Sequence, residues 1–98
     1  MGKLTDEEID AALGDPELEG WRREDGWIVK EFGYRDFREA MAFINRMARV
    51  ADRADHHPDF SSHYNRVRVA LRTWNERGVT PRDVALAKEI EAVAPSPL

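Results

Sequence analysis

The stretch DRADHHPDFSSHYNRVRVALRTWNERGVTPRD, residues 52–83, decides how this chain folds and carries most of its chemistry. Two of the three histidines, His56 and His57, stand side by side and are followed at once by Pro58. Because proline disfavours the helical conformation at the residue before it, we expect His57 to be extended. The pair is therefore predicted to lie where a helix stops and a strand begins, a position from which side chains can point into a cleft.

Beyond the histidine pair, the segment from Asp59 to Thr73 is predicted to be strand-like. Its second half alternates apolar and polar residues in a two-residue period, which is typical of a sheet with one buried face and one wet face. Val67, Val69, Leu71 and Thr73 alternate there with Arg66, Arg68, Ala70 and Arg72. Whether the first half, from Phe60 to Tyr64, forms a separate strand with a bend near Asn65 stays open. We interpret Tyr64 as a core residue and His63 as a surface residue.

Three segments carry apolar residues at helical spacing and have recognisable ends. They run from Thr5 to Leu13, from Asp36 to about Ala54 and from Thr80 to about Ala94, and each begins at a residue that caps helices well. Asp83 stands at the third position of the last helix, and we interpret it as a helix cap alone. The tail from Ala94 to Leu98 is expected to fray.

The segment from Trp21 to Tyr34 is predicted to form a β-hairpin. Its turn is Asp25-Gly26, a dipeptide that accepts the positive φ angles of a two-residue hairpin turn. We assign its tryptophans to core or cross-strand packing, because aromatic side chains contribute most to packing there. The order helix, hairpin, helix, one or two strands and helix predicts an α+β fold, an antiparallel sheet with the helices on one face.

Composition limits the class of protein. The chain has 98 residues, 42% hydrophobic and 35% charged, which fits one folded domain over residues 1–98. No apolar run approaches the roughly 20 residues needed to span a bilayer, and the N-terminus lacks the apolar core of a signal peptide. With no cysteine, disulfides and thiolate chemistry are excluded, so we expect a cytoplasmic protein without membrane contact. The net charge of -4 argues against a nucleic-acid partner.

The spacing of seven residues resembles the pattern of the pterin-4a-carbinolamine dehydratase family. These residues are Asp52, His56, His57, Pro58, Tyr64, Trp74 and Asp83. The resemblance runs from about Trp21 onward and implies a four-stranded antiparallel sheet with three helices packed on one face. It also implies homodimers or homotetramers, a pterin substrate, and a lyase reaction that removes water from a 4a-hydroxytetrahydropterin to give the quinonoid dihydropterin during tetrahydrobiopterin recycling.

Dehydration of a carbinolamine needs two proton movements and no cofactor or metal, and an imidazole group can perform either one near neutral pH. The resemblance gives the catalytic acid–base role to His56, with His57 orienting substrate and sharing the proton work. Asp52 and Trp74 are expected to bind substrate. A second role stays open for Asp52, that of orienting an imidazole. Many family members have a histidine in place of Trp74, and an indole only donates a hydrogen bond.

Three other functions stay open beside the enzyme. A weakly active or inactive family member would serve as a dimerisation or assembly partner for another protein. A metal site formed by Asp52, His56, His57 and His63 is disfavoured, because adjacent histidines rarely bind one tetrahedral ion together. Nucleic-acid binding through Arg66, Arg68 and Arg72 is remote, since the acidic total favours a solvated sheet face or a polar subunit contact.

Overall fold

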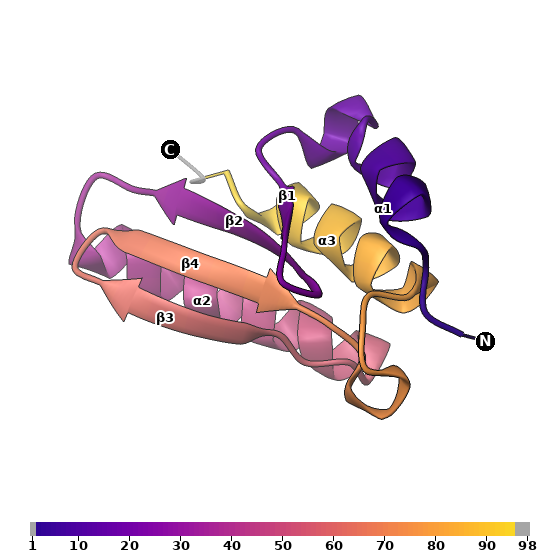
Figure 1. Ribbon diagram of the computed structural model, residues 1–98. Coiled ribbons are helices and arrows are strands. Elements are labelled where there is room, and N and C mark those ends of the chain that lie inside the picture. Colours follow the sequence, from indigo (N-terminus) through magenta and orange to yellow (C-terminus); the bar gives the residue numbers. More distant parts are fainter. Residues whose placement is uncertain (1, 96–98) are drawn as a thin grey trace.

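A four-stranded antiparallel sheet with the strand order β1-β2-β4-β3 forms the centre of the computed structural model, which describes residues 2–95 (Figure 1). The strands are β1 (Arg22–Glu24), β2 (Trp27–Gly33), β3 (Asp59–His63) and β4 (Arg66–Leu71). The helices are α1 (Asp6–Leu13), α2 (Phe37–Ala54) and α3 (Pro81–Val93), and short 3₁₀ turns occupy Pro16–Leu18 and Trp74–Glu76. The predicted α+β fold, a four-stranded antiparallel sheet with three helices, is confirmed.

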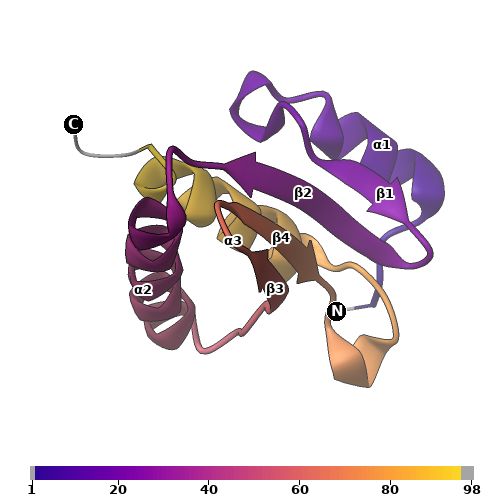
Figure 2. The same ribbon diagram turned by 90° about the vertical axis from the view of Figure 1, so that its left-hand side faces the viewer.

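The core lies between the sheet and its helices. α2 and α3 pack against each other, and α1 packs beside β1 (Figure 2). The predicted alternation in β4 is confirmed, because Val67, Val69 and Leu71 are buried in the core. The opposite face of the sheet carries no helix within the described part of the chain.

The chain from Asp59 to Leu71 forms two strands joined by a two-residue turn, which answers the question that the sequence left open. His63 pairs with Arg66 across that turn, and Tyr64 adopts a φ of 54°. The prediction that Tyr64 belongs to the core is wrong, since 67% of it is exposed. A residue at the tip of a turn projects away from the sheet into solvent, so its position decides its exposure even when its side chain is largely apolar.

The helix ends follow the predicted caps. Thr5 and Thr80 each form a capping box with the residue three positions later, and the Asp36 side chain accepts from the Glu39 backbone N–H. The C-terminal tail differs from its prediction within the described residues. Ala94 is buried and its carbonyl accepts a 2.7 Å hydrogen bond from the Tyr34 hydroxyl. Residues 96–98, the rest of the predicted frayed tail, lie outside the described residues.

No helix within residues 2–95 combines the length and the apolar character that crossing a membrane requires.

Candidate functional site

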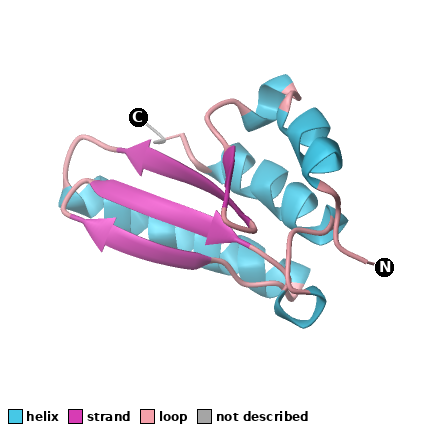
Figure 3. Cartoon of the chain, viewed as in Figure 1, coloured by secondary structure: helices cyan, strands magenta, loops and turns pink. Residues whose placement is uncertain are grey.

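The histidine pair lines a pocket formed by the loop from α2 to β3 and the loop from β4 to α3. Figure 3 shows these two loops at the same end of the molecule. The pocket has a volume of about 360 Å³. Its lining includes His56, His57, Arg72, Thr73, Trp74 and Arg82. Three of the four residues predicted to form the site, namely both histidines and Trp74, therefore share one cavity.

The end of α2 places His56 in this pocket. Asp55 takes a left-handed conformation with a φ of 51°, which aspartate tolerates better than most residues. The His56 backbone N–H then donates to the carbonyl of Ala51 at 3.2 Å, so the chain leaves the helix with the imidazole facing α3. Arg82 at the start of α3 donates to the Asp55 carbonyl at 2.7 Å and holds the two helices together at this point.

Asp83 is the partner of His56. The Nε2 atom of His56 lies 2.5 Å from Oδ1 of Asp83, a carboxylate with no exposed surface. Its other oxygen, Oδ2, accepts from the Thr80 backbone N–H and from the Thr73 hydroxyl, both at 2.9 Å. The cap that the sequence predicted is confirmed, but the interpretation of Asp83 as a cap alone is wrong, because the same carboxylate also faces the imidazole.

The 2.5 Å contact links the position of the proton on His56 to the charge on Asp83. An ionised carboxylate only accepts hydrogen bonds, so beside ionised Asp83 the Nε2 atom carries the hydrogen. The Nδ1 atom is then left as the ring nitrogen that can accept a proton. When it does so, the neighbouring carboxylate stabilises the imidazolium that forms. The His56–Asp83 pair therefore has the arrangement of a general base with an orienting acid.

His57 lies in a more open setting. Its Nε2 atom is 3.0 Å from Oδ1 of Asp52, and both side chains are mostly exposed, at 59% and 78%. Asp52 does not line the pocket; it lies beside a neighbouring apolar groove with Phe60 and His57. Within the described residues no three histidine, aspartate or glutamate side chains lie close enough together to hold a metal ion.

Trp74 begins the short turn after β4 and is 63% exposed. Its indole meets that of Trp27 edge to face, with 5.5 Å between the ring centres. A flat, exposed ring at the mouth of a pocket offers a surface for another aromatic ring. An indole only donates a hydrogen bond, so this ring takes no part in acid–base proton transfer.

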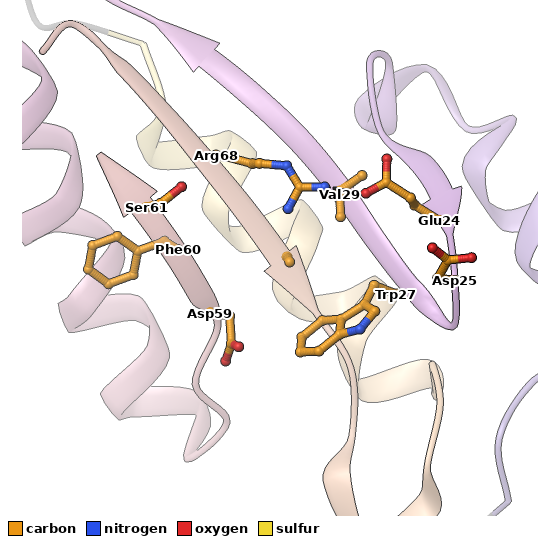
Figure 4. A pocket seen from close by; sticks show the side chains of 9 residues that line it. Glu24, Asp25, Trp27, Val29, Asp59, Phe60, Ser61 and Arg68 are labelled. Carbon is orange, nitrogen blue, oxygen red and sulfur yellow. Dashed lines mark hydrogen bonds and ion pairs between the residues drawn. The ribbon is translucent and has the colours of Figure 1, made fainter. Parts of the chain in front are cut away.

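A second hollow of about 360 Å³ lies over the open face of the sheet (Figure 4). Trp27 and Val29 contribute apolar surface to it, and Glu24, Asp25 and Asp59 give it an acidic lining. Arg68 also lines it, but its guanidinium is paired with Glu24. The hollow contains no histidine, so the residues suited to proton transfer belong to the other pocket.

Sequence reasoning missed Thr73, Arg82 and the pairing of Asp83 with His56. One signal pointed towards this network: the capping spacing from Thr80 to Asp83 predicts a carboxylate at the start of α3. The buried alternation of β4 also placed Thr73 on the inner face. Neither pattern shows which loop lies opposite the carboxylate, because 27 residues separate His56 from Asp83.

The fold and the site define an α+β protein with a paired-histidine pocket. Residues 2–93 match the family described as Pterin 4 alpha carbinolamine dehydratase, and the chain belongs to that family. A protein of Thermomicrobium roseum is 43% identical, with 96% of this chain and 99% of the relative covered. One of Metallosphaera sedula is 46% identical, with 93% of each covered. Both are named "Putative pterin-4-alpha-carbinolamine dehydratase".

Solved structures agree with the fold. The crystal structure of a transcriptional coactivator/pterin dehydratase from Brucella melitensis has a TM-score of 0.88 and 38% identity, with 96% of this chain and all of that chain covered. A pterin dehydratase-like protein identified as a RuBisCO assembly factor in the alpha-carboxysome has a TM-score of 0.67 and 19% identity. The second likeness shows the fold alone.

Proposed function

We propose that this protein is a 4a-hydroxytetrahydropterin dehydratase, a lyase that releases water and forms the quinonoid dihydropterin. The observation that carries the proposal is the His56 imidazole, which lines the pocket while its Nε2 atom is held 2.5 Å from the buried Asp83 carboxylate. Membership of the dehydratase family supports the same reaction.

The reaction breaks the bond between carbon 4a and its hydroxyl oxygen, while a ring nitrogen of the pterin loses a proton. The leaving oxygen takes up a proton and departs as water, so the two proton movements balance. His56 supplies one of these transfers through Nδ1, and Asp83 stabilises the charged imidazole in between. His57 or a water molecule performs the other transfer. We assign to Asp83 a positioning role, because it acts through His56.

The remaining predicted residues take lesser roles in this proposal. Asp52 holds the His57 ring at 3.0 Å rather than contacting the substrate, since it lies outside the pocket lining. Trp74 offers its exposed ring as a stacking surface for the flat pterin. No cofactor enters the reaction.

The test is a dehydratase assay on freshly generated 4a-hydroxytetrahydropterin with His56→Gln, His57→Gln and a matched control, His63→Gln. His63 is a third histidine, exposed on β3 and outside the pocket. We expect kcat to fall roughly 100-fold in His56→Gln, by less in His57→Gln and not at all in the control. Equal rates for the wild type and all three variants would refute the proposal.

We further propose that the chain acts as a single cytoplasmic domain and assembles with copies of itself. β3 is an edge strand, and an edge strand presents unpaired backbone groups to a partner. Phe60 on this strand is 49% exposed beside an apolar groove formed with Ile44 and Met47 of α2. A large exposed apolar side chain next to such a groove favours a protein partner, and self-association requires no other component.

The alternative from the sequence, an inactive partner protein for assembly, predicts a different result in the same assay. It requires that the wild type and the histidine variants be equally inactive and that no pterin bind. The intact His56–Asp83 pair favours the enzyme, because a protein-binding role has no use for an imidazole oriented by a buried carboxylate.

A further inference from the structure

Arg72 has an unusual setting for an arginine in this protein. It follows directly on β4, and its guanidinium carbon lies 5.4 Å from the ring centre of Trp27 and 4.9 Å from that of Trp74. The two indoles touch each other edge to face. A planar cation is therefore held by aromatic rings, an arrangement that fixes its orientation without neutralising its charge.

The hydrogen-bonding capacity of Arg72 is not satisfied by the protein. Its Nε atom is buried and has no hydrogen-bond partner among residues 2–95. Two other arginines on the open face of the sheet, Arg22 and Arg68, both pair with carboxylates. Arg72 takes part in none of the ion pairs within the described chain. A guanidinium that no carboxylate neutralises keeps its full charge, and as part of the pocket lining it can meet an acceptor on a ligand.

Arg72 lines the same pocket as His56, His57 and Trp74. The ligand that it would contact is therefore the pterin substrate of the proposed reaction. A guanidinium offers a flat fork of donors that suits an oxygen acceptor in the plane of a ring. A pterin has such an acceptor, the carbonyl oxygen at position 4, on the carbon next to the reacting carbon 4a. Holding this oxygen would fix the reacting carbon within the cavity that the imidazoles line.

We propose that Arg72 is a substrate-binding residue that donates hydrogen bonds to the 4-carbonyl oxygen of the pterin, an inference that rests on the proposed function. Trp27 and Trp74 hold the guanidinium in place for this contact. In this chain Trp74 thus acts partly through Arg72, at the position where many family members carry a histidine. Because the carbonyl is present in substrate and product alike, its recognition contributes uniform binding and is expressed in KM rather than in kcat.

The experiment uses two non-reacting probes, 7,8-dihydropterin and a 2,4-diaminopteridine. The second carries an amino group where the pterin has its carbonyl, so a donor from the protein would meet another donor. Their dissociation constants are measured by calorimetry for the wild type, for Arg72→Met and Arg72→Lys, and for the control Arg66→Gln. Arg66 lies on the same face of β4 as Arg72 but outside the pocket.

We expect the wild type to prefer dihydropterin. Arg72→Met should weaken dihydropterin binding roughly 10- to 100-fold and abolish the preference, since a hydrogen bond from a charged donor is lost. Arg72→Lys keeps the charge and should bind at an intermediate level with the preference retained, which tests the proposal even if the methionine variant unfolds. Arg66→Gln should match the wild type in its affinity for both probes and in kcat, because Arg66 lies outside the pocket.

Two results would overturn the inference in different ways. If Arg72→Met and Arg72→Lys bind both probes as the wild type does, or weaken both equally, then Arg72 does not recognise the carbonyl, while the dehydratase proposal stands. If the wild type binds neither probe and shows no dehydratase activity, the inference and the proposed function fail together.

Discussion

At the scale of single residues, the carboxylate of Asp83 does two things at once. Its Oδ2 atom completes the cap of α3, and its Oδ1 atom faces His56. Both oxygens have partners and no surface is exposed: Oδ2 accepts from Thr80 and Thr73, and Oδ1 faces the imidazole of His56. The stability of the α3 cap and the proposed orientation of His56 therefore depend on the same side chain. A useful substitution changes one of them and leaves the other intact.

Asp83→Asn makes this separation possible. An amide can still accept from the Thr80 backbone N–H, but it carries no charge to stabilise an imidazolium at His56. We expect kcat to fall roughly 100-fold, which steady-state dehydratase kinetics would measure. Thr80→Val is the control: it removes a hydroxyl from the cap and leaves the carboxylate opposite His56, so the melting temperature should fall while kcat stays near the wild-type value. If both variants lose activity in proportion to their stability, the positioning role is wrong.

At the scale of secondary-structure elements, the tight turn between β1 and β2 sets the register of the hairpin. Glu24 pairs with Trp27 across the turn, and the two residues between them, Asp25 and Gly26, have φ angles of 49° and 84°. The turn thereby determines that Trp27 lies on the open face of the sheet, next to Arg72 and Trp74. A change in the turn is therefore expected to move Trp27 and, through its contacts, the pocket residues Arg72 and Trp74.

Gly26→Ala tests the turn. A Cβ at Gly26 would meet no atom within 4 Å, so the cost comes from the positive φ alone and should be about 1 kcal/mol in the free energy of unfolding. Gly33→Ala is the matched control, because Gly33 also has open space around it but no positive φ. Denaturant unfolding of both variants provides the measurement. Equal stabilities would show that the backbone angle does not limit the substitution.

At the scale of the whole molecule, Tyr34 connects the end of β2 to the end of α3. Its hydroxyl donates to the Ala94 carbonyl at 2.7 Å, and burial raises its pKa from 10.0 to about 12. The folded protein therefore holds the phenolic proton more tightly than the unfolded chain does. The resulting stabilisation is complete below pH 10 and is lost as the pH rises from 10 towards 12.

Tyr34→Phe should remove this pH dependence. Near neutral pH the variant should be less stable by about 1 kcal/mol, because it lacks the hydrogen bond to Ala94. Between pH 10 and 12 the wild type should lose stability more steeply than the variant, so the difference between them narrows. Urea unfolding at a series of pH values would show it. Two parallel curves across this range would contradict the assignment.

Assembly is also a property of the whole molecule. Phe60→Asp places a charge at the edge of β3, beside the apolar groove of α2, and should shift the protein to a smaller species by light scattering coupled to chromatography. Phe37→Asp is the control, since Phe37 is equally exposed at 50% but lies at the other end of α2. An unchanged mass in both variants would show that the protein associates through another surface. A monomeric wild type would exclude self-association.

The sequence by itself determined what depends on local physics. Caps, helical periodicity and strand alternation placed α1, α2, α3 and β4, and the Asp25-Gly26 dipeptide placed the hairpin turn. Pro58 predicted that the histidine pair lies in a loop, and the helix before it ends at Ala54 with Asp55 as its left-handed cap. Each of these signals acts between residues a few positions apart, through steric restriction or a hydrogen bond to a nearby backbone group.

Only the tertiary structure decided which groups meet across the pocket. His56 faces Asp83 from the loop after α2, Arg72 lies against the rings of both Trp27 and Trp74, and Arg82 joins the end of α2 to the start of α3. The same is true of the exposed side chain of Tyr64, which local pattern wrongly placed in the core. Such contacts follow from strand register and helix packing, because one residue's shift along a strand moves every side chain to the other face.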